Sequence, residues 1–379
     1  MNKKTKKGHF QSNKSFFRIA WFVLLCLVSA LIARYILTGI NDMLAIGKDS
    51  YPVQVEIPEN AELGDVADIL KERGLINEKE FFTLYAIATK SNKNFVSGSY
   101  ELSTSMDYQA LLNHIQNQSN VKDIVDITLT EGMNVLEMAD MLDKNQICSK
   151  DKFLECCKSN DFDGAFTFLK AIDNPTERIY KLEGYLFPDT YKFYHGEDAE
   201  SVISKMLSNY KKRIMQKTTI EGYGSKTSIK ELAEKNGMSV ETMLNIASLI
   251  QAEAADKDDM YKVSSVIHNR LGTLKNDGKN SFGEFSMNYL RVDATVYYPY
   301  RNKNSVPKSI ASNFTGLYNT YNIQGLPPGP ICNPGLDAIL AAINPAQTDY
   351  FYYCHSKDGE AFYAKTSETH VANLRKAGL

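Results

Sequence analysis

A long apolar run near the N-terminus limits what this chain can fold into more than any other feature. The run extends from Ile19 to Ala33 and resumes after Arg34 as far as Ile40. A helix of this length crosses the hydrocarbon core of a bilayer, and the side chain of Arg34 can extend to the far interface. The run is too long and too apolar for a buried helix in a domain that has not yet begun. We therefore expect residues 19–40 to form a transmembrane helix.

The charges around this run indicate its orientation. The residues before it include no acid and six bases, which are Lys3, Lys4, Lys6, Lys7, Lys14 and Arg18. Because positive charge favours the cytoplasmic side, residues 1–18 are expected to be a cytoplasmic tail. Residues 41–52 would be a linker, and the chain beyond them would be extracytoplasmic. The alternative is a cleaved signal peptide, but no small-x-small cleavage site follows the run. We favour a single-pass anchor in the cell membrane.

The rest of the composition is that of ordinary globular domains. The 379 residues are enough for two or three domains, with 43% hydrophobic and 23% charged residues. A net charge of −2 gives no reason to expect a nucleic-acid partner. Six cysteines are present, and none belongs to a CxxC or Cys/His pattern. We predict no disulfide framework, no metal site and no cofactor.

Two successive segments share a strand–helix–helix–strand pattern. In residues 53–120, Val53–Ile57 and Gly98–Leu102 are predicted strands around two amphipathic helices. In residues 121–215, Asp189–Phe193 is the closing strand after a longer insertion. Seven residues of the first segment have a similar counterpart 72 residues further on: Val55, Ile57, Glu59, Leu63, Ala67, Leu70 and Phe81. Such a unit either binds a polymer or serves as a spacer, and the pattern alone leaves both open.

From Ser239 onward the sequence predicts two helices joined by an acidic turn. Met243, Ile246, Ile250 and Glu253 follow the i, i+3, i+7, i+10 spacing that places the Glu253 carboxyl on the apolar face of the first helix. Burial and the negative end of the helix dipole both raise the pKa of such a carboxyl. A glutamic acid that stays protonated near neutral pH can act as a general acid. The alternative is a boundary residue whose carboxylate reaches water.

Two further segments of the C-terminal part have strand character. Leu290–Tyr300 is predicted to be strand-like, and the chain near its end is predicted to form a hairpin of two strands around Lys357–Gly359.

Short motifs with a definite order surround and follow this helix pair. They are Glu183-Gly184, the segment Ala247–Ala254, Asn269-Arg270-Leu271, Leu290-x-x-Asp293-x-Thr295, Tyr318-Asn319-Thr320-Tyr321, Gly325-Leu326-Pro327-Pro328-Gly329-Pro330 and Asn333-Pro334-Gly335. This order resembles that of the endolytic murein transglycosylases of the MltG/YceG-like family. The resemblance covers nearly everything after the apolar run.

The resemblance implies an α+β fold. It implies an N-terminal transmembrane helix, LysM-like βααβ modules within residues 53–215 and an α+β catalytic domain at residues 216–379. It also implies a peptidoglycan lytic transglycosylase, which cleaves nascent glycan strands near the membrane. Peptidoglycan synthases are the protein partners expected by analogy. The alternative function is a non-catalytic scaffold that binds peptidoglycan.

The motif in the segment Ala247–Ala254 indicates which residue is the acid. Many members carry Glu-x-Glu there, whereas this chain has Gln251 at the first position and Glu253 at the second. The resemblance and the helix spacing therefore both select Glu253 as the catalytic acid. Asp293 is a possible second carboxylate, which would permit hydrolysis instead. The candidates for binding substrate are Gln251, Asn269, Arg270, Asp293, Thr295, Asn319, Tyr321, Pro327 and Pro328.

Overall fold

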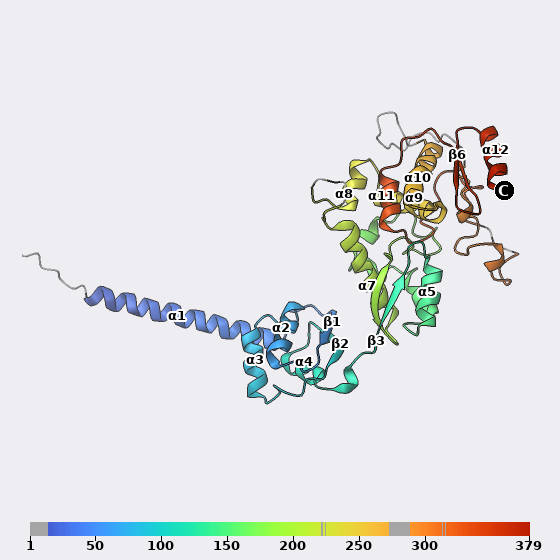
Figure 1. Ribbon diagram of the computed structural model, residues 1–379. Helices are drawn as coiled ribbons and strands as arrows, with labels where there is room; N and C mark the ends of the chain where they lie inside the picture. The colour runs from blue at the N-terminus through green and yellow to red at the C-terminus, as the bar shows by residue number, and fades with distance from the viewer. Residues whose placement is uncertain (1–13, 221–222, 224, 273–288, 313, 315) are drawn as a thin grey trace, which may run out of the picture. The chain divides into compact units, whose positions relative to one another are not determined.

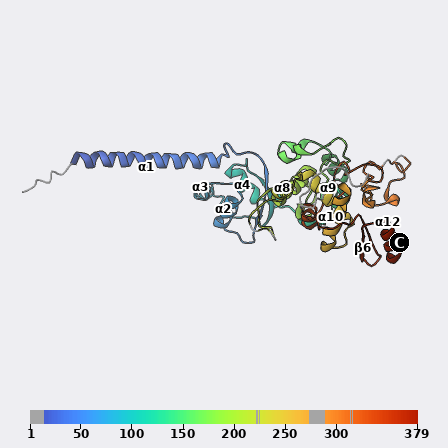
Figure 2. The ribbon, with the colours of Figure 1, turned by 90° about the horizontal axis from the view of Figure 1, so that it is seen from above.

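One long helix, α1 (Lys14–Met43), begins the part of the chain that the computed structural model describes, namely residues 14–220, 223, 225–272, 289–312, 314 and 316–379 (Figure 1). Its segment Trp21–Met43 is long and apolar enough to cross a membrane. Figure 2 shows α1 as one unbroken helix. The helix continues three residues beyond the predicted end at residue 40. Residues 1–13 of the predicted tail lie outside the described residues.

The chain divides into two compact units, Met1–Ile124 and Val125–Leu379. After α1, the elements of the first unit are β1 (Pro52–Ile57), α2 (Leu63–Glu72), α3 (Lys79–Ala88), β2 (Gly98–Ser103), α4 (Tyr108–Ile115) and the short turn η1 (Gln118–Asn120). Strands β1 and β2 pair antiparallel, with Val55 opposite Tyr100. Both side chains are buried in a core shared with α2, α3 and α4. The strand–helix–helix–strand order is the predicted one.

The second unit begins with a similar order of elements. They are β3 (Ile124–Leu129), α5 (Val135–Lys144), α6 (Lys150–Cys156), η2 (Asp161–Asp163), η3 (Thr167–Ala171), β4 (Asp189–Tyr194), α7 (Ala199–Tyr210), η4 (Lys211–Met215) and α8 (Ile229–Lys235). The turns η2 and η3 lie in the insertion predicted before the closing strand β4, which pairs with β3. Residues 125–215 share one continuous hydrophobic core with the C-terminal helices. Together with the small sheets, these helices confirm the α+β fold class.

Helix α9 (Val240–Glu253) lies at the centre of the C-terminal part. The elements after it are α10 (Lys257–Leu271), η5 (Asp293–Thr295), η6 (Lys303–Ser305), α11 (Leu336–Ile343), β5 (Tyr352–His355), β6 (Ala361–Ala364) and α12 (Ser367–Ala377). Helix α9 packs on α8, α10 and α11 (Figure 1). Met243 and Ile246 are buried as predicted, but Leu244 and Ser248 on another side are buried as well. Because neighbours cover α9 on several sides, its inward face is wider than the predicted stripe.

The segment 290–300, predicted to be strand-like, is not a strand. It contains the single turn η5. The hydroxyl of Thr295 donates to the carbonyl of Val292 at 2.6 Å, and the N–H of Ala294 donates to the carboxyl of Glu253 at 3.2 Å. The polar groups of this segment therefore bind within a local turn and to the side chain of Glu253. In a strand, the backbone groups would instead bind a neighbouring strand. The predicted hairpin around Lys357–Gly359 is present as β5 and β6.

A buried carboxyl group joins several loops of the second unit. Glu183 is fully buried. Its oxygens accept hydrogen bonds from the N–H of Val135 at 3.0 Å, the hydroxyl of Tyr298 at 2.7 Å and the side-chain amide of Asn333 at 2.7 Å. Burial raises the pKa of Glu183 to about 8, although the hydrogen bonds from Val135 and Tyr298 oppose the shift. A buried carboxyl with several donors fixes the positions of all the segments that supply them.

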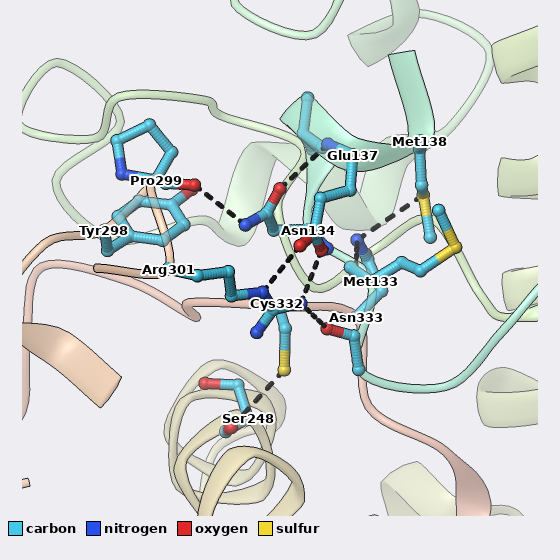
Figure 3. A network of polar contacts seen from close by, with 12 residues as sticks. Met133, Asn134, Glu137, Met138, Ser248, Tyr298, Pro299, Arg301, Cys332 and Asn333 are labelled. Atoms are coloured by element: carbon cyan, nitrogen blue, oxygen red, sulfur yellow. Dashed lines mark hydrogen bonds and ion pairs between the residues drawn. The ribbon is translucent and has the colours of Figure 1, made fainter. Parts of the chain in front are cut away.

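Asn333 extends this network, and Figure 3 shows it beside Met133 and Met138, to which its side-chain amide donates. Its side-chain carbonyl accepts from the N–H groups of Gly184 at 2.9 Å and Leu186 at 3.0 Å. Its backbone N–H donates to the carbonyl of Met133, and its own carbonyl accepts from the N–H of Gly132, both at 2.9 Å. The loop before α11 is thereby attached to the loops before α5 and β4.

Replacing Gly184 by alanine should destabilise the second unit. Gly184 has φ +87°, and a Cβ there would lie 2.6 Å from Cγ of Pro330. Strained backbone and overpacking together should lower the free energy of unfolding by about 2–4 kcal/mol. Gly164→Ala is the matched control, since φ there is −69° and a Cβ would meet no heavy atom within 4 Å. Denaturant unfolding followed by circular dichroism measures both; equal stabilities would contradict the argument.

Glu183→Gln should change how stability depends on pH. Glu183 has a pKa of about 8 in the folded protein, against a usual value of 4.5. The folded state therefore binds this proton more tightly, and the free energy of unfolding should fall as pH rises from about 4.5 to 8. One such group accounts for at most about 1.4 kcal/mol per pH unit. The variant should lose this part of the slope, as measured by unfolding from pH 5 to pH 8. A slope unchanged in Glu183→Gln would show that the carboxyl is ionised throughout.

Candidate active site

A cavity of about 570 Å³ lies beside the C-terminal end of α9. It is lined by Glu253, Arg270, Arg291, Asp293, Tyr321, Tyr352, Tyr353, Cys354, His355, Ser367, His370, Leu374 and Leu379. Four of these are predicted site residues, namely Glu253, Arg270, Asp293 and Tyr321. They come from α9, α10 and two loops, so the fold brings together residues that are up to 68 positions apart in the sequence.

Glu253 is the last residue of α9, which ends where Ala254 takes an extended backbone. One carboxyl oxygen accepts from the N–H of Ala294 at 3.2 Å, and the other accepts from the hydroxyl of Tyr353 at 3.0 Å. Burial raises the pKa of Glu253, and the charge of Asp293 adds to the rise. The two hydrogen bonds and the charge of Arg270 oppose it. The net shift favours the protonated acid, while the hydrogen bonds and Arg270 also stabilise the carboxylate when it forms.

Asp293 and Tyr321 form a pair at the same cavity. The Tyr321 hydroxyl donates to the Asp293 carboxylate at 2.5 Å. Burial and this carboxylate raise the pKa of Tyr321 to about 12. The two loops are joined behind the pair, because the hydroxyls of Thr295 and Thr320 lie 3.0 Å apart and the N–H of Thr320 donates to Thr295 at 3.1 Å. Thr295 is fully buried and supports the loops from behind.

Arg270 borders the cavity while its guanidinium binds backbone carbonyls. It donates to the carbonyls of Phe351, at 2.7 Å, and Leu290. The rings of Tyr352 and Tyr353 lie 5.9 and 5.6 Å from it. Burial lowers the pKa of Arg270, while the tyrosines and Glu253 favour the charged form. The arginine therefore connects α10 to β5 and keeps a positive charge near Glu253.

The remaining predicted residues lie elsewhere. The Asn269 side chain donates to the carbonyls of Thr348 and Tyr350, both at 2.8 Å, and supports the approach to β5. The Asn319 side chain accepts from the N–H of Tyr321 at 2.9 Å and shapes that loop. The cavity at Glu253 is lined by neither asparagine.

Gln251, Pro327 and Pro328 line two other cavities. Gln251 accepts from the N–H of Gly335 at 3.0 Å and lines a cavity of about 550 Å³ that also contains Glu131. The two prolines line a cavity of about 460 Å³. The structure thus separates these three predicted residues from the acid at the end of α9.

Sequence reasoning missed Tyr353, which donates directly to Glu253. Tyr353 lies in the segment Tyr350–His355, predicted only as a strand of the C-terminal hairpin. It is 100 residues from Glu253, and no local pattern connects the two. His355, also missed, lies 2.9 Å from the carboxylate of Asp259 at the start of α10. Within the described ranges, no group of three or more His, Cys, Asp and Glu side chains is arranged to hold a metal ion.

The fold and this cavity define an α+β protein with one shielded carboxylic acid at the end of a central helix. The chain belongs to the YceG-like family, which matches residues 55–376. An endolytic murein transglycosylase of Bacillus subtilis (strain 168) is 30% identical over 339 residues, which cover 86% of this chain and 85% of that protein. One from Streptococcus pneumoniae (strain D39) is 27% identical, over 94% of this chain and 64% of that longer protein.

A solved structure agrees with this assignment. The crystal structure of a YceG-like protein from Listeria monocytogenes matches with a TM-score of 0.51 and 27% sequence identity. The match covers 85% of this chain and 98% of that one.

Tyr353→Phe should raise the pKa of Glu253 further. The Tyr353 hydroxyl donates to the carboxylate, so its loss removes an interaction that favours the charged form. We therefore expect the pKa of Glu253 to rise in this variant. The carboxyl band in infrared difference spectra measures it during a pH titration, with Glu253→Gln as the blank. Tyr352→Phe is the control, because Tyr352 lines the same cavity. A pKa that stays in place or falls in Tyr353→Phe would contradict this role.

Proposed function

We propose that this chain is a membrane-anchored lytic transglycosylase that cleaves peptidoglycan glycan strands internally. The single observation that carries the proposal is the Glu253 carboxyl, which has a raised pKa and lies at a cavity beside Asp293 and Tyr321. The names of the relatives from Bacillus subtilis and Streptococcus pneumoniae support the same activity.

The proposed reaction needs one acid. Protonated Glu253 gives its proton to the oxygen that links N-acetylmuramic acid to N-acetylglucosamine, and the bond from that oxygen to C1 of the muramic acid breaks. The resulting carboxylate takes a proton from the muramic acid's own 6-hydroxyl. The 6-oxygen then bonds to C1 and closes a 1,6-anhydro ring. Glu253 ends protonated again, and no water is consumed.

The surroundings of Glu253 suit both halves of this cycle. Burial keeps the acid protonated before the bond breaks. The N–H of Ala294 and the hydroxyl of Tyr353 stabilise the carboxylate that forms next. The negative charge of Asp293 would stabilise the oxocarbenium-like sugar, and Tyr321 holds that carboxylate in place.

The other site residues fall into two groups in this proposal. Asn269, Thr295 and Asn319 act through the loops they hold, and Arg270 combines that role with a charge beside the acid. Gln251, Pro327 and Pro328 would contact sugars farther from the broken bond, since they line separate cavities.

Membrane attachment is part of the proposal. Helix α1 would cross the cell membrane once, with the N-terminus in the cytoplasm and the catalytic part outside. Cleavage would then occur close to newly made strands and would end their elongation. Peptidoglycan synthases are the proposed partners. The βααβ units are LysM-like in the proposal and would serve either to bind glycan or as a spacer.

Hydrolysis is the second candidate reaction. Asp293 lines the same cavity as Glu253, so two carboxyl groups face one substrate site. In a hydrolase the second carboxylate would serve as nucleophile or would activate water. The products distinguish the two reactions, because hydrolysis leaves reducing ends.

Mass spectrometry of products from uncrosslinked glycan strands tests the proposal. We expect ends with 1,6-anhydro-muramic acid, and a loss of roughly 10²–10⁴-fold in rate for Glu253→Gln. Glu234→Gln, which alters an exposed carboxylate on α8, is the control and should keep full activity. Reducing ends would favour hydrolysis. No cleavage by the unaltered chain, with binding to glycan intact, would favour the scaffold.

A further inference from the structure

The end of α1 is attached firmly to the first unit. Asp42 is buried, and its carboxylate accepts from the N–H groups of Asn77 at 2.7 Å and Glu78 at 2.9 Å, just before α3. Lys48 lies 2.7 Å from the same carboxylate, and the Tyr108 hydroxyl also donates to it. The carboxylate thus satisfies N–H groups at the start of α3, where a negative charge is favourable.

Helix α3 also contacts α1 well before its end. The ring of Phe81 packs on Gly39, where a Cβ would lie 2.4 Å from the ring. The same ring lies edge-on to Tyr35, with 6.3 Å between the ring centres. Tyr35 is five residues before Ile40, the predicted outer end of the membrane span, which is about 7–8 Å along a helix. If α1 spans the bilayer as proposed, Phe81 lies at the depth of the outer acyl-chain boundary.

The face of α3 next to Phe81 is apolar and exposed. Leu84 and Ile87 are 65% and 53% exposed, whereas Phe82 and Ala86 on the opposite face are buried in the core of the unit. Figure 1 shows α3 running across the direction of α1. An amphipathic helix that crosses a membrane span in this way has the form of an interfacial helix.

The charged residues at the ends of α3 are compatible with this position. Lys90 and Lys93 are exposed just after the helix ends, where ammonium groups can reach lipid phosphates. Glu80 is exposed in the first turn and lies four residues before Leu84, on the same face of the helix. The start of α3 is bound to Asp42, beyond the predicted outer end of the membrane span, so the carboxylate of Glu80 lies among the lipid headgroups.

We propose that α3 lies in the outer interface of the same membrane, with Phe81, Leu84 and Ile87 among the upper acyl chains. This inference rests on the membrane attachment in the proposed function. The occupant is lipid because the exposed face of α3 continues the apolar surface of α1 through the contact of Phe81 with Tyr35. The first unit is therefore held at the membrane surface by two elements.

Tryptophan fluorescence tests this position, because Trp21 in α1 is the sole tryptophan of the chain. The full chain is reconstituted into vesicles of phosphatidylcholine and phosphatidylglycerol with bromine atoms on the upper acyl chains. In a Trp21→Phe background, Leu84→Trp and Ile87→Trp should each lose emission to an extent comparable to Trp21 in the unaltered chain. Glu234→Trp, at an exposed position of α8, should lose none. Circular dichroism verifies that each variant is folded.

The outcomes distinguish the interfacial placement of α3 from the proposed membrane anchor α1, on which it rests. Quenching of Trp21 without quenching at either α3 position would overturn the interfacial placement and leave the anchor standing. No quenching of Trp21 would remove the anchor and the interfacial helix together. Strand cleavage is measured separately, so loss of activity alone would not affect the placement of α3.

Discussion

The buried carboxyl of Glu183 and the side chain of Asn333 bind to each other at 2.7 Å, and the loops of the second unit depend on this contact. Asn333 holds the backbone of Gly184 and Leu186, and Glu183 holds Val135 at the start of α5. A buried charge or amide is tolerated only where its partners are in place. This requirement fixes the loop before α11, and α11 in turn packs on the helix that carries the candidate acid.

Glu253 is also shielded from water and hydrogen-bonded, but its role differs from that of Glu183. Glu183 has no exposed surface, so its role is to hold segments together. Glu253 lines an open cavity, and its two donors come from a loop and from β5. Burial raises the pKa of both carboxyl groups. Access to the cavity, more than the direction of the pKa shift, therefore distinguishes the candidate catalyst from the structural acid.

Local patterns predicted the helices and the paired strands well because these elements depend on neighbours in sequence. The periodicity of Met243, Ile246 and Ile250 was sufficient to predict α9. The strand expected at residues 290–300 is absent because its polar groups bind Glu253 and form turns, and the contact with Glu253 has no local signature. The role of Tyr353 depends on a contact across 100 residues. Single-sequence patterns contain little information about such contacts.

The interaction of Gln251 explains how glutamine can stand where many family members have glutamate. Its side-chain oxygen accepts from the N–H of Gly335 at the start of α11, and a carboxylate oxygen could accept the same bond. Glu131 lies against Gly335, and burial raises its pKa. A second carboxylate at position 251 would add like charge beside Glu131, and an amide avoids that repulsion. The contact at position 251 thus needs an acceptor and no proton, whereas the proposed chemistry needs an acid, which only Glu253 offers on this helix end.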